Sequence, residues 1–303
     1  MTSTPIAAIL FSLVAATAVL ALGRRDGENS SRISGLALLL LLAFPLLSLL
    51  PKIPILPAAE NIASQSYSVS VVVLVLPFGS LVLLARLAIA GWTLQRWRKG
   101  SNLLEQRTTR HGRAVEVRSL PELASPCAAG VFRPVIFVPA SWTEWNLSTR
   151  EMVLAHELAH HARHDPLWRW LGSLACALHW FNPLVWWLAR RHALQSEFAC
   201  DAAVVASGVD ASAYSHTLCD LAAARTPSLA LAMSGPALGE RIKRLRDRPR
   251  RASRTMAGLA LALLIGSALT TAICRRAAPP EQPAPDRGEV ILRLTADPFP
   301  ANP

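Results

Sequence analysis

The residues His156-Glu157-Leu158-Ala159-His160 combine two imidazoles and one carboxylate within five positions. On an α-helix, residues four apart leave the same face, so His156 and His160 can bind one metal ion. Glu157 lies about 100° around the helix from His156, beside that site rather than in it. There it can take a proton from water and pass it to a leaving amine. The motif therefore predicts a zinc metallopeptidase, with His156 and His160 as ligands and Glu157 as the catalytic base.

Two histidines are too few, because catalytic zinc takes three protein ligands and a water molecule. Glu197 and Asp201 are four positions apart on a predicted helix, so they share one face. If that helix returns antiparallel, Glu197 can be the third ligand, and Asp201 can hold the free ring nitrogen of a ligand histidine. The alternative is that both are solvated acidic residues.

The other histidines nearby are weaker candidates, because they point away from the HExxH face or lack a partner at ligand spacing. We expect surface or ligand-supporting roles for His161 and His164. We expect structural roles for His179 and His192. Glu197 therefore remains the expected third ligand.

The sequence predicts three consecutive helices that position these side chains, at about residues 149–164, 166–180 and 183–206. A capping box of Ser148 and Glu151 marks the start of the first helix. Each of the other two begins at a proline that follows a capping residue, in the pairs Asp165-Pro166 and Asn182-Pro183.

The composition indicates a membrane protein, since 52% of the 303 residues are apolar and only 17% are charged. A bilayer span needs about 20 apolar residues. Four stretches are long enough: 5–23, 33–50, 69–91 and 256–274. Basic residues lie between the first two stretches, after the third and before the fourth, so all basic loops share the cytoplasmic side. We therefore expect three transmembrane helices within residues 1–91 and a fourth at 256–274, with both termini outside.

Residues 92–255 form the expected cytoplasmic domain, with a small β-element of short strands at 114–117 and 135–138. Near 166–189 the chain is unusually apolar. We expect there a helical hairpin that dips into the membrane surface or packs among the spans, with an ordinary buried core as an equal alternative. The Pro-rich tail at 275–303 is expected to lie outside without a core of its own.

The net charge of +11 does not by itself indicate a nucleic-acid partner. The densest basic stretch, residues 241–254, comes directly before a predicted span. At such a boundary anionic lipid explains the charge, so we expect the lipid bilayer as a partner and no direct contact with nucleic acid.

Beyond the HExxH motif, the region resembles the BlaR/MecR-type membrane zinc metallopeptidases, which are antirepressor proteases that respond to β-lactams. The combination of matches is far more specific than HExxH alone. The matching residues are Ser125-Pro126, residues 130–136, Pro139, residues 154–160, Arg163, Asp165-Pro166-Leu167, residues 180–186, Glu197 and Cys200-Asp201.

The resemblance implies a mainly α, multi-pass protein of the bacterial inner membrane with a gluzincin-like zinc protease domain in the cytoplasm. It implies a zinc site of His156, His160 and Glu197 with Glu157 as the base. It also implies regulatory cleavage of a cytoplasmic protein, such as a winged-helix repressor of the BlaI/MecI type. Full sensors of this family carry a penicillin-binding domain after the last span, whereas this sequence continues for only about thirty residues. We therefore expect no sensing of β-lactams by acylation.

Two other functions fit the same motifs. One is a housekeeping protease that degrades misfolded membrane proteins, for which HExxH and a downstream ExxxD are also typical. The other is a non-catalytic signalling scaffold with a structural zinc ion. The glutamate at position 157 argues against the scaffold, because a structural site does not need it.

Overall fold

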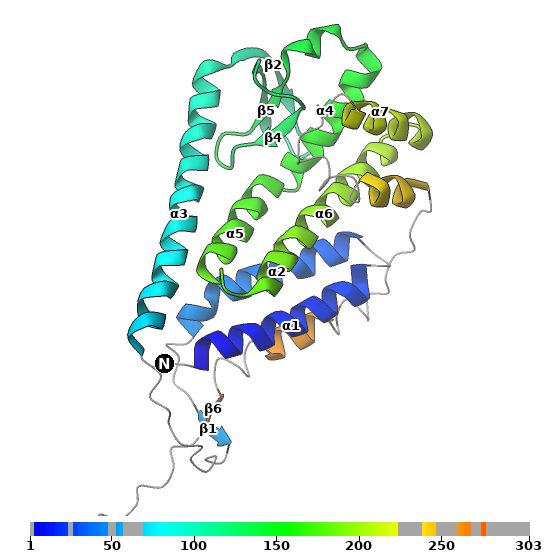
Figure 1. Ribbon diagram of the computed structural model, residues 1–303. Coiled ribbons are helices and arrows are strands. Elements are labelled where there is room, and N and C mark those ends of the chain that lie inside the picture. Colours follow the sequence, from blue (N-terminus) through cyan, green and yellow to red (C-terminus); the bar gives the residue numbers. More distant parts are fainter. Residues whose placement is uncertain are drawn as a thin grey trace, which may run out of the picture.

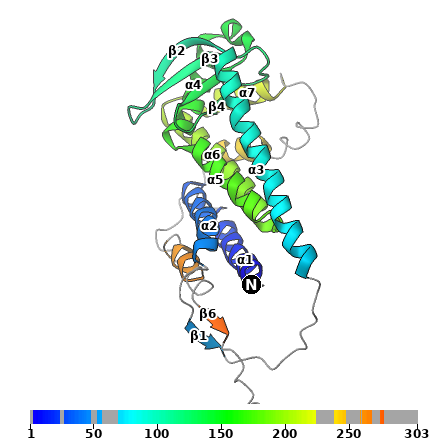
Figure 2. The same cartoon turned by 90° about the vertical axis from the view of Figure 1, so that its left-hand side faces the viewer.

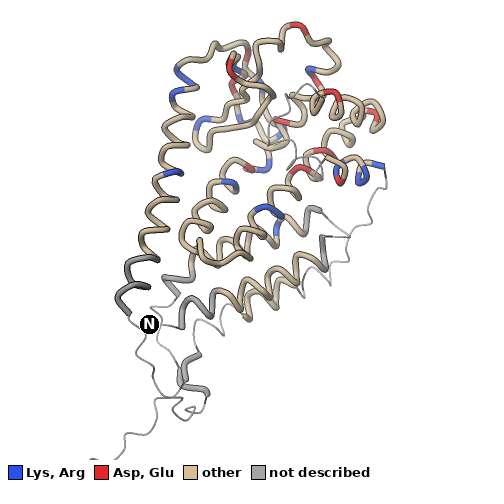
Figure 3. The backbone as a smooth tube through the Cα atoms, viewed as in Figure 1, with Lys and Arg blue, Asp and Glu red and all other residues tan. Residues whose placement is uncertain are grey.

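The computed structural model describes residues 3–23, 27–47, 53–56, 69–223, 238–246, 258, 260–267 and 274–276. The protein is mainly helical, with a small sheet at one end and long apolar helices at the other (Figure 1). Charged residues of the described chain gather at the sheet end, whereas the apolar helices carry almost none (Figure 3).

The first three apolar stretches form helices, in agreement with the sequence: α1 (Ser3–Gly23), α2 (Gly27–Leu47) and α3 (Val69–Gly100). In α3 the segment Pro77–Gly100 is long and apolar enough to cross a membrane. Within the described residues, α1 and α2 offer only the shorter apolar segments Ile9–Leu20 and Ser30–Ala43. The four-span topology is therefore not confirmed.

Within the fourth predicted span, residue 258 and residues 260–267 are helical, and Cys274 begins a strand. Most of the tail at 275–303, and residues 247–254 of the basic stretch, lie outside the described residues. At the end of the predicted span, β6 (Cys274–Arg276) pairs in parallel with β1 (Ile53–Leu56).

A four-stranded sheet stands at the charged end in the order β2-β3-β5-β4. Its strands are β2 (Asn102–Thr108), β3 (Ala114–Ser119), β4 (Cys127–Ala129) and β5 (Val135–Val138). The two strands expected from the sequence are β3 and β5, which pair in parallel. Every residue of β5 is buried, and its Ile136 and Val138 pack against Val153 and Leu154 of the HExxH helix.

Between residues 140 and 223 the sheet is followed by one 3₁₀ turn and four helices: η1 (Ala140–Glu144), α4 (Leu147–Ala162), α5 (Asp165–Leu178), α6 (Pro183–Ala206) and α7 (Ala211–Ala223). The predicted capping box is wrong. Asn146 caps α4 by accepting a hydrogen bond from the backbone N–H of Thr149 at 2.7 Å, and Ser148 lies inside the helix. The Glu151 carboxylate instead accepts from Arg107 at 2.8 Å.

The turn between α4 and α5 is tight, because His164 adopts a left-handed backbone conformation (φ 61°). Asp165 is therefore the first residue of α5 rather than its cap, which corrects the sequence expectation. The Asn182 cap is confirmed, since its side chain accepts from the backbone N–H of Leu184 at 3.1 Å.

The hairpin of α5 and α6 packs against α1 and α2 in one apolar core (Figure 2). Ala175, Cys176, Val185 and Leu188 of the hairpin are all buried in this core. The same contact carries polar bonds, such as that from His179 Nε2 to the carbonyl oxygen of Leu41 at 3.0 Å. The predicted hairpin is thus packed among the apolar helices.

Candidate metal centre

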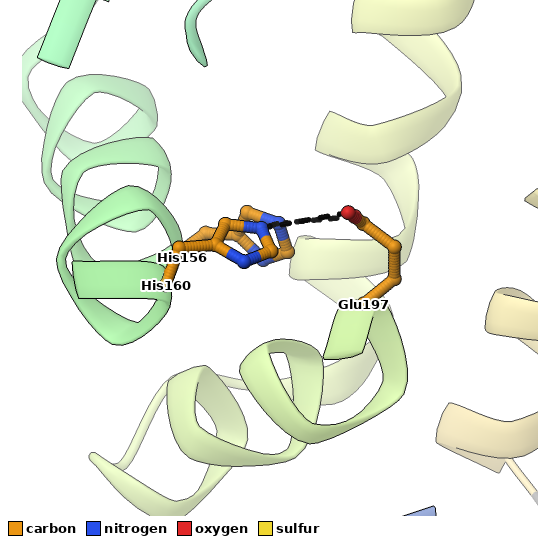
Figure 4. A group of neighbouring side chains, drawn as sticks. All are labelled: His156, His160 and Glu197. Carbon is orange, nitrogen blue, oxygen red and sulfur yellow. Dashed lines mark hydrogen bonds and ion pairs between the residues drawn. The ribbon is translucent and has the colours of Figure 1, made fainter. Parts of the chain in front are cut away.

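Helices α4 and α6 pack together and bring the predicted ligands to one point (Figure 4). The Nε2 atoms of His156 and His160 lie 3.2 Å apart. Glu197 places Oε2 3.4 Å from His156 Nε2 and Oε1 3.5 Å from His160 Nε2. Tetrahedral zinc with nitrogen and oxygen ligands at about 2.0–2.1 Å requires those atoms to be about 3.3 Å apart. The three side chains therefore fit a zinc ion.

His160 is held by groups from the start of α5 and from α6. Its Nδ1 lies 2.8 Å from Asp165 Oδ2 and 3.3 Å from the Sγ of Cys200. Ser196 donates to the other Asp165 oxygen at 3.2 Å. With Nδ1–H donating to the carboxylate, the Nε2 lone pair of His160 is free to face a metal.

His156 is held by a different set of groups. Its Nδ1 lies 2.9 Å from the Tyr214 hydroxyl and 3.2 Å from Asp201 Oδ1. The hydroxyl has one proton and donates it to Asp201 at 2.8 Å, so it can accept from His156 Nδ1–H. Arg241 in turn donates to both Asp201 oxygens, at 2.8 and 2.6 Å. The Nε2 atom of His156 is thereby turned toward Glu197.

Arginines flank Glu197 on both sides. Arg241 Nη1 lies 3.2 Å from Oε2, and Arg169 Nη2 lies 3.0 Å from Oε1. Burial alone would raise the pKa of Glu197, but its bond to His156 and the positive charges nearby hold that pKa far below its usual range. Glu197 is therefore an anion at all physiological pH values, as a metal ligand must be.

At the imidazole of His156, a proton competes with a metal ion. Burial would lower its pKa, but hydrogen bonds to Asp201 and Glu197 outweigh burial and raise the pKa to about 10. A metal ion binds only the neutral ring, so metal binding must release this proton.

Glu157 lies on α4 beside the ligands and is 8% exposed. Among the residues that the structure describes, it makes no hydrogen bond or ion pair. Its carboxylate is therefore available to accept a proton from a molecule at the metal site.

The remaining histidines lie outside this centre. His161 is buried and bonds through Nε2 to the carbonyl oxygen of Val135 at 3.0 Å, so it ties α4 to the sheet. The surface role considered for it is wrong, whereas His164 is exposed as expected. His179 and His192 are confirmed as structural, because each bonds a backbone oxygen of α2 at 3.0 Å.

Sequence reasoning missed three supporting residues. The sequence analysis assigns Asp165 no contact with His160, although an acidic residue five positions after a ligand histidine is a usable signal. Tyr214 gave no signal, because it is 58 residues from His156. Arg241 is the first residue of the basic stretch expected to contact anionic lipid, but the structure places it on a separate helix at 238–246, where its guanidinium contacts Asp201 and Glu197 instead.

Comparison with known proteins places this centre within a described family. The family model "BlaR1 peptidase M56" matches residues 55–245, which include all the residues named above. The chain is also 37% identical over 95 residues to "Regulatory protein BlaR1" of Bacillus licheniformis. That match covers 31% of this chain and only 16% of the relative's length.

Proposed function

Because the chain belongs to the BlaR1 peptidase M56 family, we propose that it is a zinc-dependent endopeptidase anchored in a membrane. The observation that carries the proposal is the convergence of His156, His160 and Glu197 at spacings that suit tetrahedral zinc. A structural zinc site is closed by four ligands, whereas a catalytic site keeps one position open. Three ligands beside an unpaired Glu157 favour catalysis over a scaffold.

Zinc, when bound, supplies a Lewis acid that polarises the scissile carbonyl and makes water acidic enough to attack at neutral pH. The chain's own residues handle the proton and hold the geometry. Glu157 accepts the proton of the attacking water and returns it to the departing amine nitrogen. Asp165 and Asp201 keep the two imidazoles oriented, and Arg241 fixes the carboxylate of Glu197 from outside.

The proposed membrane anchor agrees with the surface of α3. Large apolar side chains are exposed along its segment Pro77–Gly100, where lipid would cover them: Phe78, Leu81, Val82, Ile89 and Trp92. We place the zinc centre on the cytoplasmic side of a bacterial inner membrane and both termini outside, on the basis of the basic loops.

We further propose a regulatory role, with a cytoplasmic protein such as a winged-helix repressor of the BlaI/MecI type as the substrate. The name of the Bacillus licheniformis relative, a regulatory protein, supports this role. In such a system proteolysis removes the repressor and so transduces a signal to transcription.

The activity is tested on the purified chain in detergent by measuring zinc content and cleavage of a mixed peptide library by mass spectrometry. We expect one zinc ion per chain, cleavage that stops with a chelator, and recovery when zinc is returned. Cleavage that persists in the chelator would contradict the zinc mechanism.

The substrate is tested by quantitative proteomics of the host with the parent protein and with Glu157→Gln. A regulatory protease predicts one or a few stabilised cytoplasmic proteins in the variant. Stabilisation of many unrelated membrane proteins would instead support a quality-control protease.

A further inference from the structure

Helix α2 lies against α5 and α6 (Figure 2). The face that it presents to them includes buried serines. Ser34 Oγ and the backbone oxygen of Ser31 each lie 3.0 Å from His192 Nδ1. A Cβ at Gly35 would lie 3.1 Å from the ring of Trp168, so α2 and α5 pack closely at this point. Both serines are buried, at 2% exposure for Ser31 and 0% for Ser34.

From this face a chain of polar contacts leads to the metal centre. Arg163, directly after α4, donates from Nη2 to Ser31 Oγ at 3.2 Å. Its Nε lies 3.6 Å from Asp165 Oδ2, the oxygen that contacts His160 Nδ1 at 2.8 Å. Only the side chains of Arg163 and Asp165 therefore separate α2 from a proposed zinc ligand.

The distance between Arg163 and Asp165 is slightly longer than that of a hydrogen bond. A distance of 3.6 Å allows charge attraction but is too long for a bond. The Nε atom is buried and has no hydrogen-bond partner among the described residues, which is a costly arrangement. A movement of a few tenths of an ångström would complete the bond or lengthen the contact further.

We propose that Arg163 is a positioning residue through which α2 sets the orientation of His160. A displacement of α2 relative to α4 then changes the orientation of His160 at the metal centre. In this way a movement of the apolar helices alters the proposed protease site. The inference rests on the proposed metal centre and adds a control to it. Arginine suits this role, because its planar guanidinium offers separate donors to Ser31 and Asp165 at a fixed angle.

The test measures zinc affinity by competition, and the absorption spectrum of the cobalt-loaded protein, on the full chain in detergent. We expect Arg163→Ala to weaken zinc binding about tenfold, the lower end of the effect of ligand-supporting residues, and to shift the cobalt bands. Arg163→Lys keeps the charge and should recover part of the affinity. Ser31→Ala should have a smaller effect of the same sign that vanishes in the Arg163→Ala background.

Ser34→Ala is the matched control, because Ser34 lies on the same buried face but contacts His192 instead of Arg163. It should leave zinc affinity unchanged. If the Arg163 and Ser31 variants melt earlier but keep the parent's zinc affinity and cobalt spectrum, Arg163 is only structural and the inference is wrong. If Arg163→Ala does not fold, the zinc affinities and cobalt spectra of Arg163→Lys and Ser31→Ala still decide whether Arg163 is a positioning residue. If the parent chain binds neither zinc nor cobalt, the proposed metal centre itself is wrong. That result differs from one in which the parent binds zinc and the variants bind it equally well.

Discussion

The two proposed ligand histidines lie one turn apart on α4, yet different parts of the molecule hold them. His160 contacts Asp165, the first residue of α5. Arg163 lies between Asp165 and Ser31 of α2 and contacts both. His156 depends on Asp201 and Tyr214, and behind them on Arg241 from a helix distant in sequence. His160 is thus linked to the apolar helix α2, whereas His156 is linked to α7 and to the helix at 238–246. Two separate parts of the protein therefore hold one centre in place.

The largest expected effect comes from Glu197, which contacts both His156 and His160. Glu197→Ala removes the third ligand, so zinc affinity should fall more than the 10- to 100-fold typical of supporting residues. Zinc content after dialysis measures it. Glu151→Ala, an exposed glutamate of α4, is the control and should keep its zinc. Equal zinc content in Glu197→Ala and the parent would assign the third ligand to another residue.

The two halves should differ when each loses its acidic support. Asp165→Ala leaves His160 Nδ1 without a carboxylate, so we expect zinc affinity to fall about 100-fold. Asp201→Ala leaves the Tyr214 hydroxyl on His156, so the loss should be about tenfold. Adding Tyr214→Phe to Asp201→Ala should bring the loss close to that of Asp165→Ala. Identical losses in the two single variants would remove the asymmetry.

The pH dependence of zinc binding examines the side of the centre that holds His156. Its raised pKa of about 10 means that the ring carries a proton at neutral pH and must lose it to bind zinc. Zinc affinity should therefore rise up to tenfold per unit as pH increases from 6 to 8, with release of about one proton per zinc. Calorimetry in buffers of different ionisation enthalpy counts the protons. An affinity that does not change over this range would mean that His156 is already neutral.

The sequence was most informative where its signals were local. The start of α6 at Pro183 follows from the Asn-Pro pair, and the shared faces of His156 with His160 and of Glu197 with Asp201 follow from helical periodicity. The capping box failed because Asn146 lies two positions before Ser148 and caps the helix first. The burial of His161 could not be foreseen, since it depends on where β5 packs on α4. Tyr214 and Arg241 reach the centre only through tertiary packing, which helical spacing does not reveal.

Glu157 provides the most direct test of the central claim, that this centre performs proteolysis. Glutamine keeps the shape of the side chain but cannot accept the proton, and Glu157 is not among the three proposed ligands. Peptide cleavage by purified Glu157→Gln should therefore fall about 10²- to 10⁴-fold, while zinc stays near one ion per chain. Cleavage at the parent rate by a zinc-loaded Glu157→Gln variant would contradict the account.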